Sequence, residues 1–338
     1  MSNLVVKIKH HANLTGELRK ALQIANYAIK NRYKLSSANV SYIGLPSAIS
    51  NQILRKYGKN KKCKHINPDK IKLIAPSQSI KINSNQIRII PLKLNLINES
   101  KYKIIKVNQI ELDNTYAYVC FEQEDQEQLK TNQYIGVDLN ATSHCAVVGD
   151  PTYGKVIKLG KQASHIHKKY KALRSSLQKQ GLYKKLKKTK GKETRKVKDI
   201  NHKISKQIVQ FAKDNNCGIK LEKLTGIRNS KKNHKSFRYT LNSWSYYQLG
   251  SMIAYKALLK GIPVQYIDPA YTSQNCSRCG HLGKRNGKVF KCVNCGHTGH
   301  ADVNASFNIA KSNAVISTTE KRIGSNGTTE VPMRQRNV

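Results

Sequence analysis

Residues 134–140 read YIGVDLN, and a second apolar stretch, CAVV, follows at residues 145–148. Both stretches are short and carry β-branched side chains, and the polar residues between them suit a tight connection. The pattern predicts a β-hairpin in the centre of a sheet. Asp138 is the one charged residue of the first stretch, so the hairpin carries a carboxylate among apolar side chains.

The chain beyond this hairpin alternates between helical and strand patterns. Residues 161–213 are saturated with lysine, apolar side chains recur at helical spacing on two arms, and Gly181 and Gly191 offer breaks between them. Acids are nearly absent from these arms, which favours contact with a polyanion over a merely solvated hairpin. Further strands are expected at 218–222 and 263–268, and helices at 243–260 and 302–310. This order predicts an α/β fold.

The N-terminal third has a different pattern. Helices are expected at 14–34 and 46–57, and strands at 3–9, 71–75, 79–82, 86–94, 102–107 and 116–121. This order predicts a small barrel that is split by a helical insert. The acidic, Gln-rich stretch 121–127 marks a boundary. Residues 18–68 contain no acid at all, which favours a phosphate-contacting surface over a basic face that is only solvated.

The charge of the chain points to nucleic acid. The 338 residues include 61 Lys and Arg against 19 Asp and Glu, a formal net charge of +42. A small soluble domain carries a net charge of roughly 2–8, and a larger excess is typical of a chain that binds a polyanion. No apolar run approaches the ~18 residues of a membrane span, and no signal-peptide cleavage site follows the N-terminus.

Four of the eight cysteines form two pairs, Cys276-X-X-Cys279 and Cys292-X-X-Cys295, with twelve residues between them. Gly280 and Gly296 follow the pairs and permit the tight turn of a metal knuckle. The spacing predicts a tetrahedral structural zinc site, with a redox or disulfide role as the alternative. The other cysteines are scattered and are expected to be small buried side chains. Reduced thiols indicate a cytoplasmic or nuclear setting.

Three acids occupy positions where a bare carboxylate is costly. Asp138 lies in a strand, Glu222 ends one, and Asp302 opens a helix. Each has a simple alternative role: a turn with Asn140, a surface position at a strand end, and a helix N-cap. Together they fit phosphodiester cleavage by two Mg²⁺ ions, which needs oxygen ligands from several elements. The sequence leaves open whether the three acids meet.

Five motifs in this order resemble the TnpB family, whose members are transposon-encoded RNA-guided DNA nucleases similar to the ancestors of type V CRISPR effectors. They are GVDLN at 136–140, LEKL at 221–224, YTSQNCSRCG at 271–280, CVNCG at 292–296 and ADVNASFNI at 301–309. The resemblance implies a RuvC-like nuclease on an RNase H fold, with Asp138, Glu222 and Asp302 as its metal-binding triad. Many relatives carry Arg where this chain has Ala301.

The resemblance also implies a domain plan. Residues 1–125 are expected to form a WED-like β-barrel with a REC-like helical insert at about 13–65. Residues 126–311 are expected to form the RuvC-like domain, with a zinc-ribbon insert at about 270–300 and a lid at 225–241. Residues 312–338 are expected to be a disordered tail.

The function implied by the resemblance is RNA-guided cleavage of double-stranded DNA next to a short adjacent motif. The expected cofactors are two Mg²⁺ ions, one structural Zn²⁺ and a guide RNA (omega RNA), in a prokaryotic cytoplasm at the nucleoid. The alternatives are an RNA-guided repressor that does not cut, and a guide-independent nuclease or transposase. The expected nucleic-acid contacts are Arg55, Lys56, Lys168, Lys169, Lys184, Lys185, Lys187 and Lys188, and the residues suggested to read the adjacent motif are Tyr42, Asn51 and Gln52.

Overall fold

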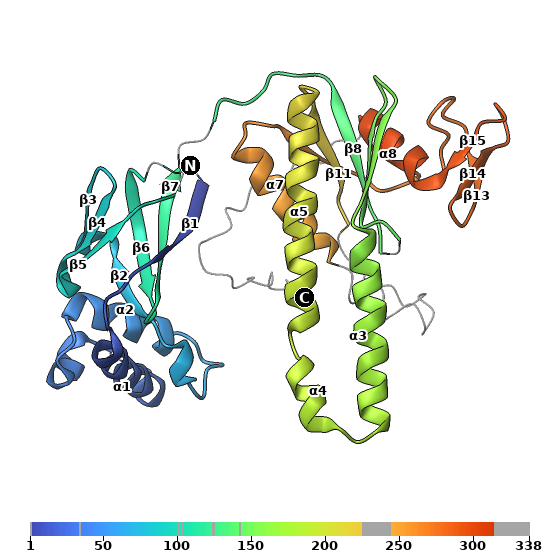
Figure 1. Cartoon of the computed structure of the whole chain (residues 1–338). Coiled ribbons are helices and arrows are strands. Elements are labelled where there is room, and N and C mark those ends of the chain that lie inside the picture. Colours follow the sequence, from blue (N-terminus) through green and yellow to red (C-terminus); the bar gives the residue numbers. More distant parts are fainter. Residues whose placement is uncertain are drawn as a thin grey trace, which may run out of the picture. The chain divides into compact units, whose positions relative to one another are not determined.

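The computed structural model describes residues 2–33, 35–100, 102, 104–123, 126–141, 143–224 and 245–313. Two compact units are present (Figure 1): an N-terminal unit, Met1–Asp125, and a C-terminal unit that begins at Gln126. The expected lid at 225–241 lies outside the described residues, as does the expected tail from residue 314 onward.

The N-terminal unit contains two antiparallel sheets and a pair of helices. The first sheet has the order β1-β7-β6-β2, and the second has the order β3-β4-β5. The bounds of the strands are β1 Ser2–Lys9, β2 Leu73–Pro76, β3 Ile80–Asn83, β4 Gln86–Ile89, β5 Leu94–Ile97, β6 Lys106–Leu112 and β7 Tyr116–Gln123. The helices are α1 Thr15–Asn31 and α2 Ser47–Gly58, and four short 3₁₀ turns are η1 Ser37–Ile43, η2 Pro68–Lys70, η3 Ser77–Ser79 and η4 Ile90–Leu92.

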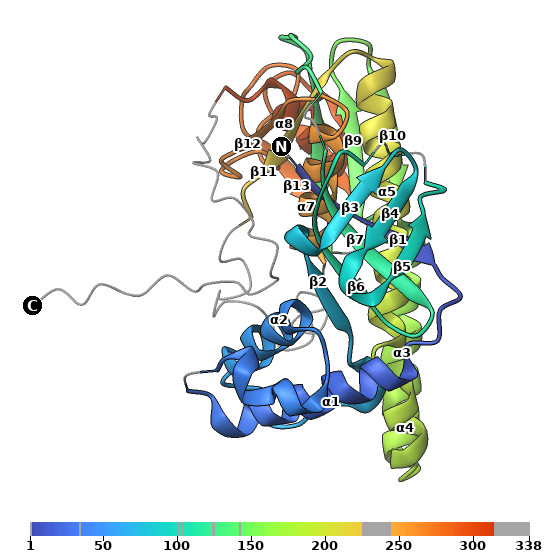
Figure 2. The ribbon, with the colours of Figure 1, turned by 90° about the vertical axis from the view of Figure 1, so that its left-hand side faces the viewer.

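Small side chains on α1 allow α2 to pack closely against it. Ala21, Ala25 and Ala28 recur on the buried face of α1, as the helical spacing predicts, and Ile49 and Ile53 of α2 belong to the same core. The two helices lie side by side beneath the strands of this unit (Figure 2). One hydrophobic core therefore joins the helices to the first sheet.

The strand pattern of this unit was predicted less well than its helices. The expected strand at 86–94 is two strands, β4 and β5, separated by η4, because Pro91 has no N–H to donate and Lys93 adopts a left-handed conformation. The bounds of the strand expected at 102–107 are wrong, since β6 begins only at Lys106 and continues to Leu112. The described strands of this unit pair as two separate sheets, and their pairing does not close into the expected barrel.

The C-terminal unit is built on a five-stranded mixed sheet of order β10-β9-β8-β11-β12. The strands are β8 Tyr134–Leu139, β9 Ala146–Asp150, β10 Lys155–Leu159, β11 Gly218–Glu222 and β12 Val264–Ile267. β8, β9 and β10 are antiparallel neighbours, and β11 runs parallel to both β8 and β12. The predicted central hairpin, β8–β9, is confirmed.

Helices cover the two faces of this sheet. α5 (Lys192–Asp214) and α7 (Tyr246–Leu258) share the hydrophobic core on one face, where Ile135 and Val137 of β8 point. α8 (Ala301–Lys311) lies on the opposite face (Figure 1). Because side chains alternate along a strand, Gly136 and Asp138 face α8.

The lysine-rich arms form α3 (Lys161–Lys179), the short α4 (Tyr183–Thr189) and α5, with breaks at the two predicted glycines. α5 buries the expected apolar stripe, whereas Leu173 of α3 remains 39% exposed. Glu193 joins the arms, since its carboxylate contacts His167 Nδ1 at 2.6 Å and Arg174 Nη1 at 2.5 Å. Glu193, one of the two acids within residues 161–213, thus stabilises the hairpin itself.

Two glycines bring α8 directly onto the sheet. Gly136 of β8 pairs with Gly149 of β9, and both face the helix. A methyl group at Gly136 would overlap the backbone of Ser306 and Ala310, and one at Gly149 would overlap the side chains of Ser306 and Phe307. The close approach fixes the position of the helix relative to β8.

We expect Gly136→Ala to lower the free energy of unfolding by about 1–3 kcal/mol, because backbone atoms of α8 must move to make room. Gly250→Ala is the matched control: it lies in α7, its methyl group would meet only Leu139 Cδ1 at 4.0 Å, and helix propensity favours Ala. Urea unfolding of both variants checks this, and equal stability of the two would contradict it.

None of the helices in the described part of the chain is both long and apolar enough to cross a membrane.

Candidate active site and metal centre

Asp138 and Glu222 lie next to each other at the carboxyl ends of neighbouring parallel strands. The register pairs Val137 with Leu221, so the residue that follows in each strand is one of the two acids. Both side chains are on the α8 face of the sheet, because they alternate with the buried Val137 and Leu221. The carboxyl ends of parallel strands are a common place for ligands.

Asp302 is the second residue of α8, whose other end packs over β8 and β11. The N-cap of the helix is His300, so the alternative role of Asp302 as an N-cap is wrong. The side chain of Asp302 is only 1% exposed. At the far end of the helix, Lys220 Nζ of β11 donates to the carbonyl oxygens of Ala310 and Ser312, which anchors α8 to the sheet.

Glu222 and Asp302 lie close enough to Asp138 to perturb its pKa. Burial raises the pKa of Asp138 to about 7, and the charges of Glu222 and, more weakly, Asp302 act in the same direction. Asn140 Nδ2 donates to Asp138 Oδ2 at 2.9 Å, which opposes the shift in pKa. Burial also raises the pKa of Glu222, and a 2.5 Å hydrogen bond from Thr272 Oγ1 opposes it. Asp138, for which a turn with Asn140 was the alternative role, thus bonds to Asn140 and also lies beside the other two acids.

The raised pKa of Asp138 predicts a pH dependence of stability. Between about pH 4 and pH 7 the folded carboxyl group keeps a proton that the unfolded chain has lost. The free energy of unfolding should therefore fall as the pH rises through this window. Urea unfolding at pH 5 and pH 8, without Mg²⁺, should show wild type losing stability relative to Asp138→Asn, which cannot titrate. A pH-independent difference between the two proteins would contradict the assignment.

Two cations hold the third carboxylate. Arg285 Nη2 lies 2.9 Å from Asp302 Oδ1, and Lys288 Nζ lies 2.5 Å from Asp302 Oδ2. Sequence reasoning missed both residues, because Arg and Lys are abundant in this chain and neither lies in a recognisable motif. It also missed Thr272, which holds Glu222.

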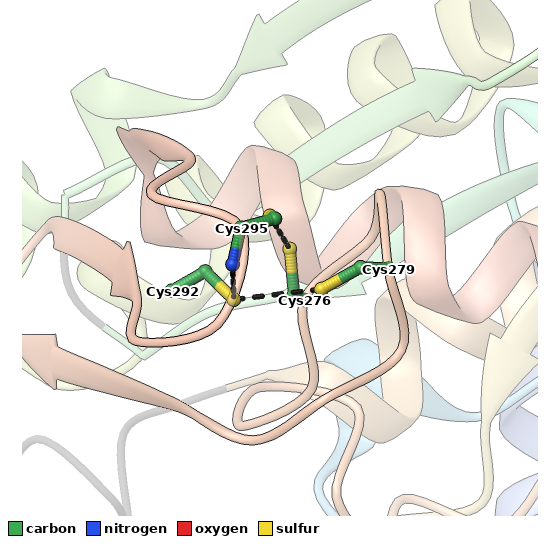
Figure 3. Close-up of side chains that lie close together, drawn as sticks. All are labelled: Cys276, Cys279, Cys292 and Cys295. Atoms are coloured by element: carbon green, nitrogen blue, oxygen red, sulfur yellow. Dashed lines mark hydrogen bonds between the residues drawn. The ribbon is translucent and has the colours of Figure 1, made fainter.

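Arg285 lies on β13 (Gly283–Asn286), and Lys288 lies in the turn between β13 and β14 (Val289–Cys292). With β15 (Thr298–His300) these strands form a small three-stranded sheet, with the buried Phe290 at its centre. The four cysteines in and around this sheet form the predicted cluster (Figure 3). Cys276 Sγ lies 3.7 Å from Cys295 Sγ, Cys279 Sγ lies 3.5 Å from Cys292 Sγ, and the four sulfurs lie within 4.8 Å of one another. A tetrahedral zinc ion with bonds of about 2.3 Å separates its sulfur ligands by about 3.8 Å, so the cluster fits zinc.

The disulfide alternative does not describe this arrangement, because all eight cysteines are free thiols. Of the scattered ones, Cys217 is buried as expected, whereas Cys63, Cys120 and Cys145 are only half-buried. Among the described residues, the four-cysteine group is the one set of three or more His, Cys, Asp or Glu side chains whose ligand atoms could hold a metal ion as they stand. The carboxylates approach one another without forming such a set.

α8 and the ribbon (residues 272–300) are joined by hydrogen bonds. The backbone N–H of Ala301 donates to the carbonyl oxygen of Lys288 at 2.8 Å. Asn304 Oδ1 accepts from the backbone N–H of Ser277 at 2.8 Å, and Lys311 Nζ donates to the carbonyl oxygen of Ser277 at 2.8 Å. Asn308 adds bonds to the carbonyl oxygens of Thr272 and Asn275. The ribbon therefore sits in a defined position beside Asp302.

The expected nucleic-acid contacts lie on helix surfaces of both units. Those of the C-terminal unit are exposed on α3 and α4: Lys168, Lys169, Lys184, Lys185, Lys187 and Lys188. Arg55 and Lys56 are exposed on α2, but Lys56 Nζ forms a 2.7 Å ion pair with Glu111. Part of the charge expected to face phosphate is thus used within the N-terminal unit.

The residues suggested for the adjacent motif lie on η1 and α2. Tyr42 is 77% exposed on η1. Asn51 is exposed on α2, and its Oδ1 accepts from the backbone N–H of Ser37, which ties η1 to α2. Gln52 is half-buried. Asn51 therefore has a structural role whatever else it contacts.

Residues 246–309 match a family model described as "Cas12f1-like, TNB domain". A TnpB-like protein of Methanocaldococcus jannaschii is 32% identical over 260 residues, which cover 72% of this chain and 90% of that protein. The CRISPR-associated endodeoxyribonuclease Cas12f1 of Sulfoacidibacillus thermotolerans is 33% identical over 214 residues, 58% of this chain and 49% of that protein.

The fold also matches a solved structure. A cryo-EM structure of a Cas12f1–sgRNA–target DNA complex aligns with a TM-score of 0.59 and 16% sequence identity, covering 90% of this chain and 82% of that one. This likeness shows a shared fold. The relative from M. jannaschii, matched along nearly its whole length, shows more, because its similarity to this chain includes the sequence itself. The chain belongs to the TnpB family.

Proposed function

We propose that this protein is an RNA-guided endonuclease, encoded by a transposable element, that cuts double-stranded DNA next to a short adjacent motif. The observation that carries the proposal is the convergence of Asp138, Glu222 and Asp302 from two neighbouring strands and a helix. The similarity to proteins named endodeoxyribonucleases, and to a fold seen with sgRNA and target DNA, supports it. The cell compartment that we propose is the prokaryotic cytoplasm, at the nucleoid.

In this proposal the two units have separate tasks. The N-terminal unit is WED-like, with α1, η1 and α2 as a REC-like insert, and it binds guide RNA and the adjacent motif. The C-terminal unit is a RuvC-like nuclease on an RNase H-like sheet, with the ribbon as its zinc-binding insert. Base pairing with the guide RNA reads the target sequence, and the protein recognises the shape of the heteroduplex.

Asp138 and Glu222 would hold Mg²⁺ at the carboxyl ends of β8 and β11, and Asp302 would complete the ligand set. Burial raises the pKa of Asp138 most, and the charges of Glu222 and Asp302 add to the effect; a divalent cation would relieve this repulsion, so the carboxylates fit the ion. Two bound ions supply an activated water and stabilise the leaving oxygen. Asn140 and Thr272 orient the carboxylates through their hydrogen bonds.

The exposed lysines of α3 and α4 would contact phosphate. Neither α3 nor α4 contains an Asp or Glu, and the nearby Glu193 of α5 is bound to His167 and Arg174. We expect Lys187→Gln combined with Lys188→Gln to weaken RNA binding and to lower the magnitude of its salt-dependence slope by about 1–2. The control is Lys155→Gln, because Lys155 bonds to Asn215 within the unit. An unchanged slope would exclude these lysines from the interface.

Sequencing of the RNA that copurifies with the protein tests the proposal. A discrete RNA should be recovered, and DNA matching its guide segment should be cut when Mg²⁺ is added. If no discrete RNA is found, guide dependence fails. If the complex binds matching DNA without cutting it, the alternative of an RNA-guided repressor is correct. The ion pairs that occupy Asp302 are the observation that favours this alternative.

A further inference from the structure

Side chains of the ribbon bind the third carboxylate, Asp302. Both oxygens of Asp302 are engaged, one by Arg285 and one by Lys288, although the side chain itself is 1% exposed. The two cations flank the turn at Gly287 between β13 and β14, and Arg285 Nε also donates to the carbonyl oxygen of Gly287. The other two acids bond only to neutral donors in the described part of the chain, namely Asn140 and Thr272.

The net charge of this cluster determines how strongly it attracts a metal ion. Three carboxylates and two side-chain cations carry a formal charge of −1, which is a weak attraction for two divalent ions. A metal ion that takes Asp302 must also approach two fixed positive charges at ion-pair distance. Phosphate can remove this obstacle, because Arg and Lys bind phosphate oxygens as readily as carboxylate oxygens.

The ribbon itself cannot easily move away. Asn304, Asn308 and Lys311 of α8 bond to residues 272–277, directly before and within the first cysteine pair, and Ala301 bonds to the backbone of Lys288. Release of Asp302 therefore requires only that two long side chains change partner. Side-chain rotation of this kind is much cheaper than displacement of a zinc-bound sheet.

We propose that Arg285 and Lys288 form a gate on metal loading: they compete with divalent cations for Asp302 in the free protein, and nucleic-acid phosphate releases them. The inference rests on the proposed function of the three carboxylates. It assigns the ribbon a regulatory role, because metal affinity becomes high only when a phosphate backbone lies at the site. A free protein of this kind would remain largely without its catalytic metal.

The test is calorimetric titration of Mn²⁺ into the full-length protein in chelator-free buffer, so that zinc is retained. Arg285→Gln and Lys288→Met should each bind Mn²⁺ on the order of tenfold more tightly than wild type, a coupling of about 1.4 kcal/mol. Lys284→Met is the matched control, because Lys284 is the exposed neighbour of Arg285 and points to the other face of β13. Its Mn²⁺ affinity should stay within about twofold of wild type if the contact, and not net charge, is responsible.

A second arm adds a short phosphorothioate oligonucleotide, with Asp138→Asn/Glu222→Gln as the blank for Mn²⁺ that binds the oligonucleotide. The oligonucleotide should tighten Mn²⁺ binding to wild type by about tenfold, and binding to the Arg285→Gln/Lys288→Met double variant much less.

The outcomes separate the gate from the proposed function. Equal Mn²⁺ affinity in wild type and the double variant overturns the gate and leaves the metal site standing. Weaker Mn²⁺ binding in the double variant also overturns it, because the two cations would then only position Asp302. If Mn²⁺ binds no better to wild type or to the double variant than to the blank, the carboxylate metal site itself is wrong.

Discussion

Asp138→Asn should reduce DNA cleavage by roughly a thousandfold or more while leaving the protein folded and able to bind its RNA and target. The variant keeps the shape of the side chain and its proximity to Asn140, but it removes the carboxylate that we propose as a metal ligand. Loss of metal-ion catalysis is worth several kcal/mol, and each 1.36 kcal/mol is tenfold in rate. The measurement is single-turnover cleavage of matching DNA with Mg²⁺.

Asp199→Asn is the matched control for this variant. Asp199→Asn removes the same single negative charge from the same unit, but Asp199 is exposed on α5 and forms an ion pair with Lys203. Its cleavage rate should equal that of wild type. Above pH 7, Asp138→Asn should be more stable than wild type, so lost activity in this variant would not come from unfolding. Retained cleavage in Asp138→Asn would remove Asp138 from the active site.

Cys292→Ser should abolish zinc binding and cleavage together. The ribbon has a small core, in which Phe290 is the largest buried side chain, so a zinc ion held by the four cysteines would supply most of its folding free energy. Structural zinc contributes about 10–16 kcal/mol of apparent binding free energy in small zinc modules. Without it, the ribbon would lose the hydrogen bonds that position α8, and with it Asp302, over the sheet.

Three measurements check this prediction: the zinc-to-protein ratio by elemental mass spectrometry, the thermal unfolding profile, and the cleavage rate. Cys63→Ser is the control, because Cys63 lies in the N-terminal unit and bonds only weakly to the carbonyl oxygen of His65. It should retain one zinc ion and full activity. A zinc-free wild-type protein with normal activity and stability would show that the cluster has another role.

Parts of the fold that depend on local pattern were predictable. The β8–β9 hairpin is visible in two apolar stretches, and the arms α3 and α5 are visible in helical periodicity interrupted by Gly181 and Gly191. The cysteine cluster follows from spacing alone, because two Cys-X-X-Cys pairs can direct four sulfurs to one point. The strands of the N-terminal unit were harder to place, since Pro91 and Lys93 interrupt an otherwise continuous apolar run.

The sequence by itself determined which acids are unusual and which family the motifs resemble, because a carboxylate among apolar residues is costly and therefore conspicuous. Only the tertiary structure decided that Asp138 and Glu222 are neighbours, since they lie 84 residues apart in the sequence and a parallel register brings them together. It also decided the pairing of Asp302 with Arg285 and Lys288. In a chain with 61 basic residues no local pattern distinguishes these two, and the fold selects them by distance.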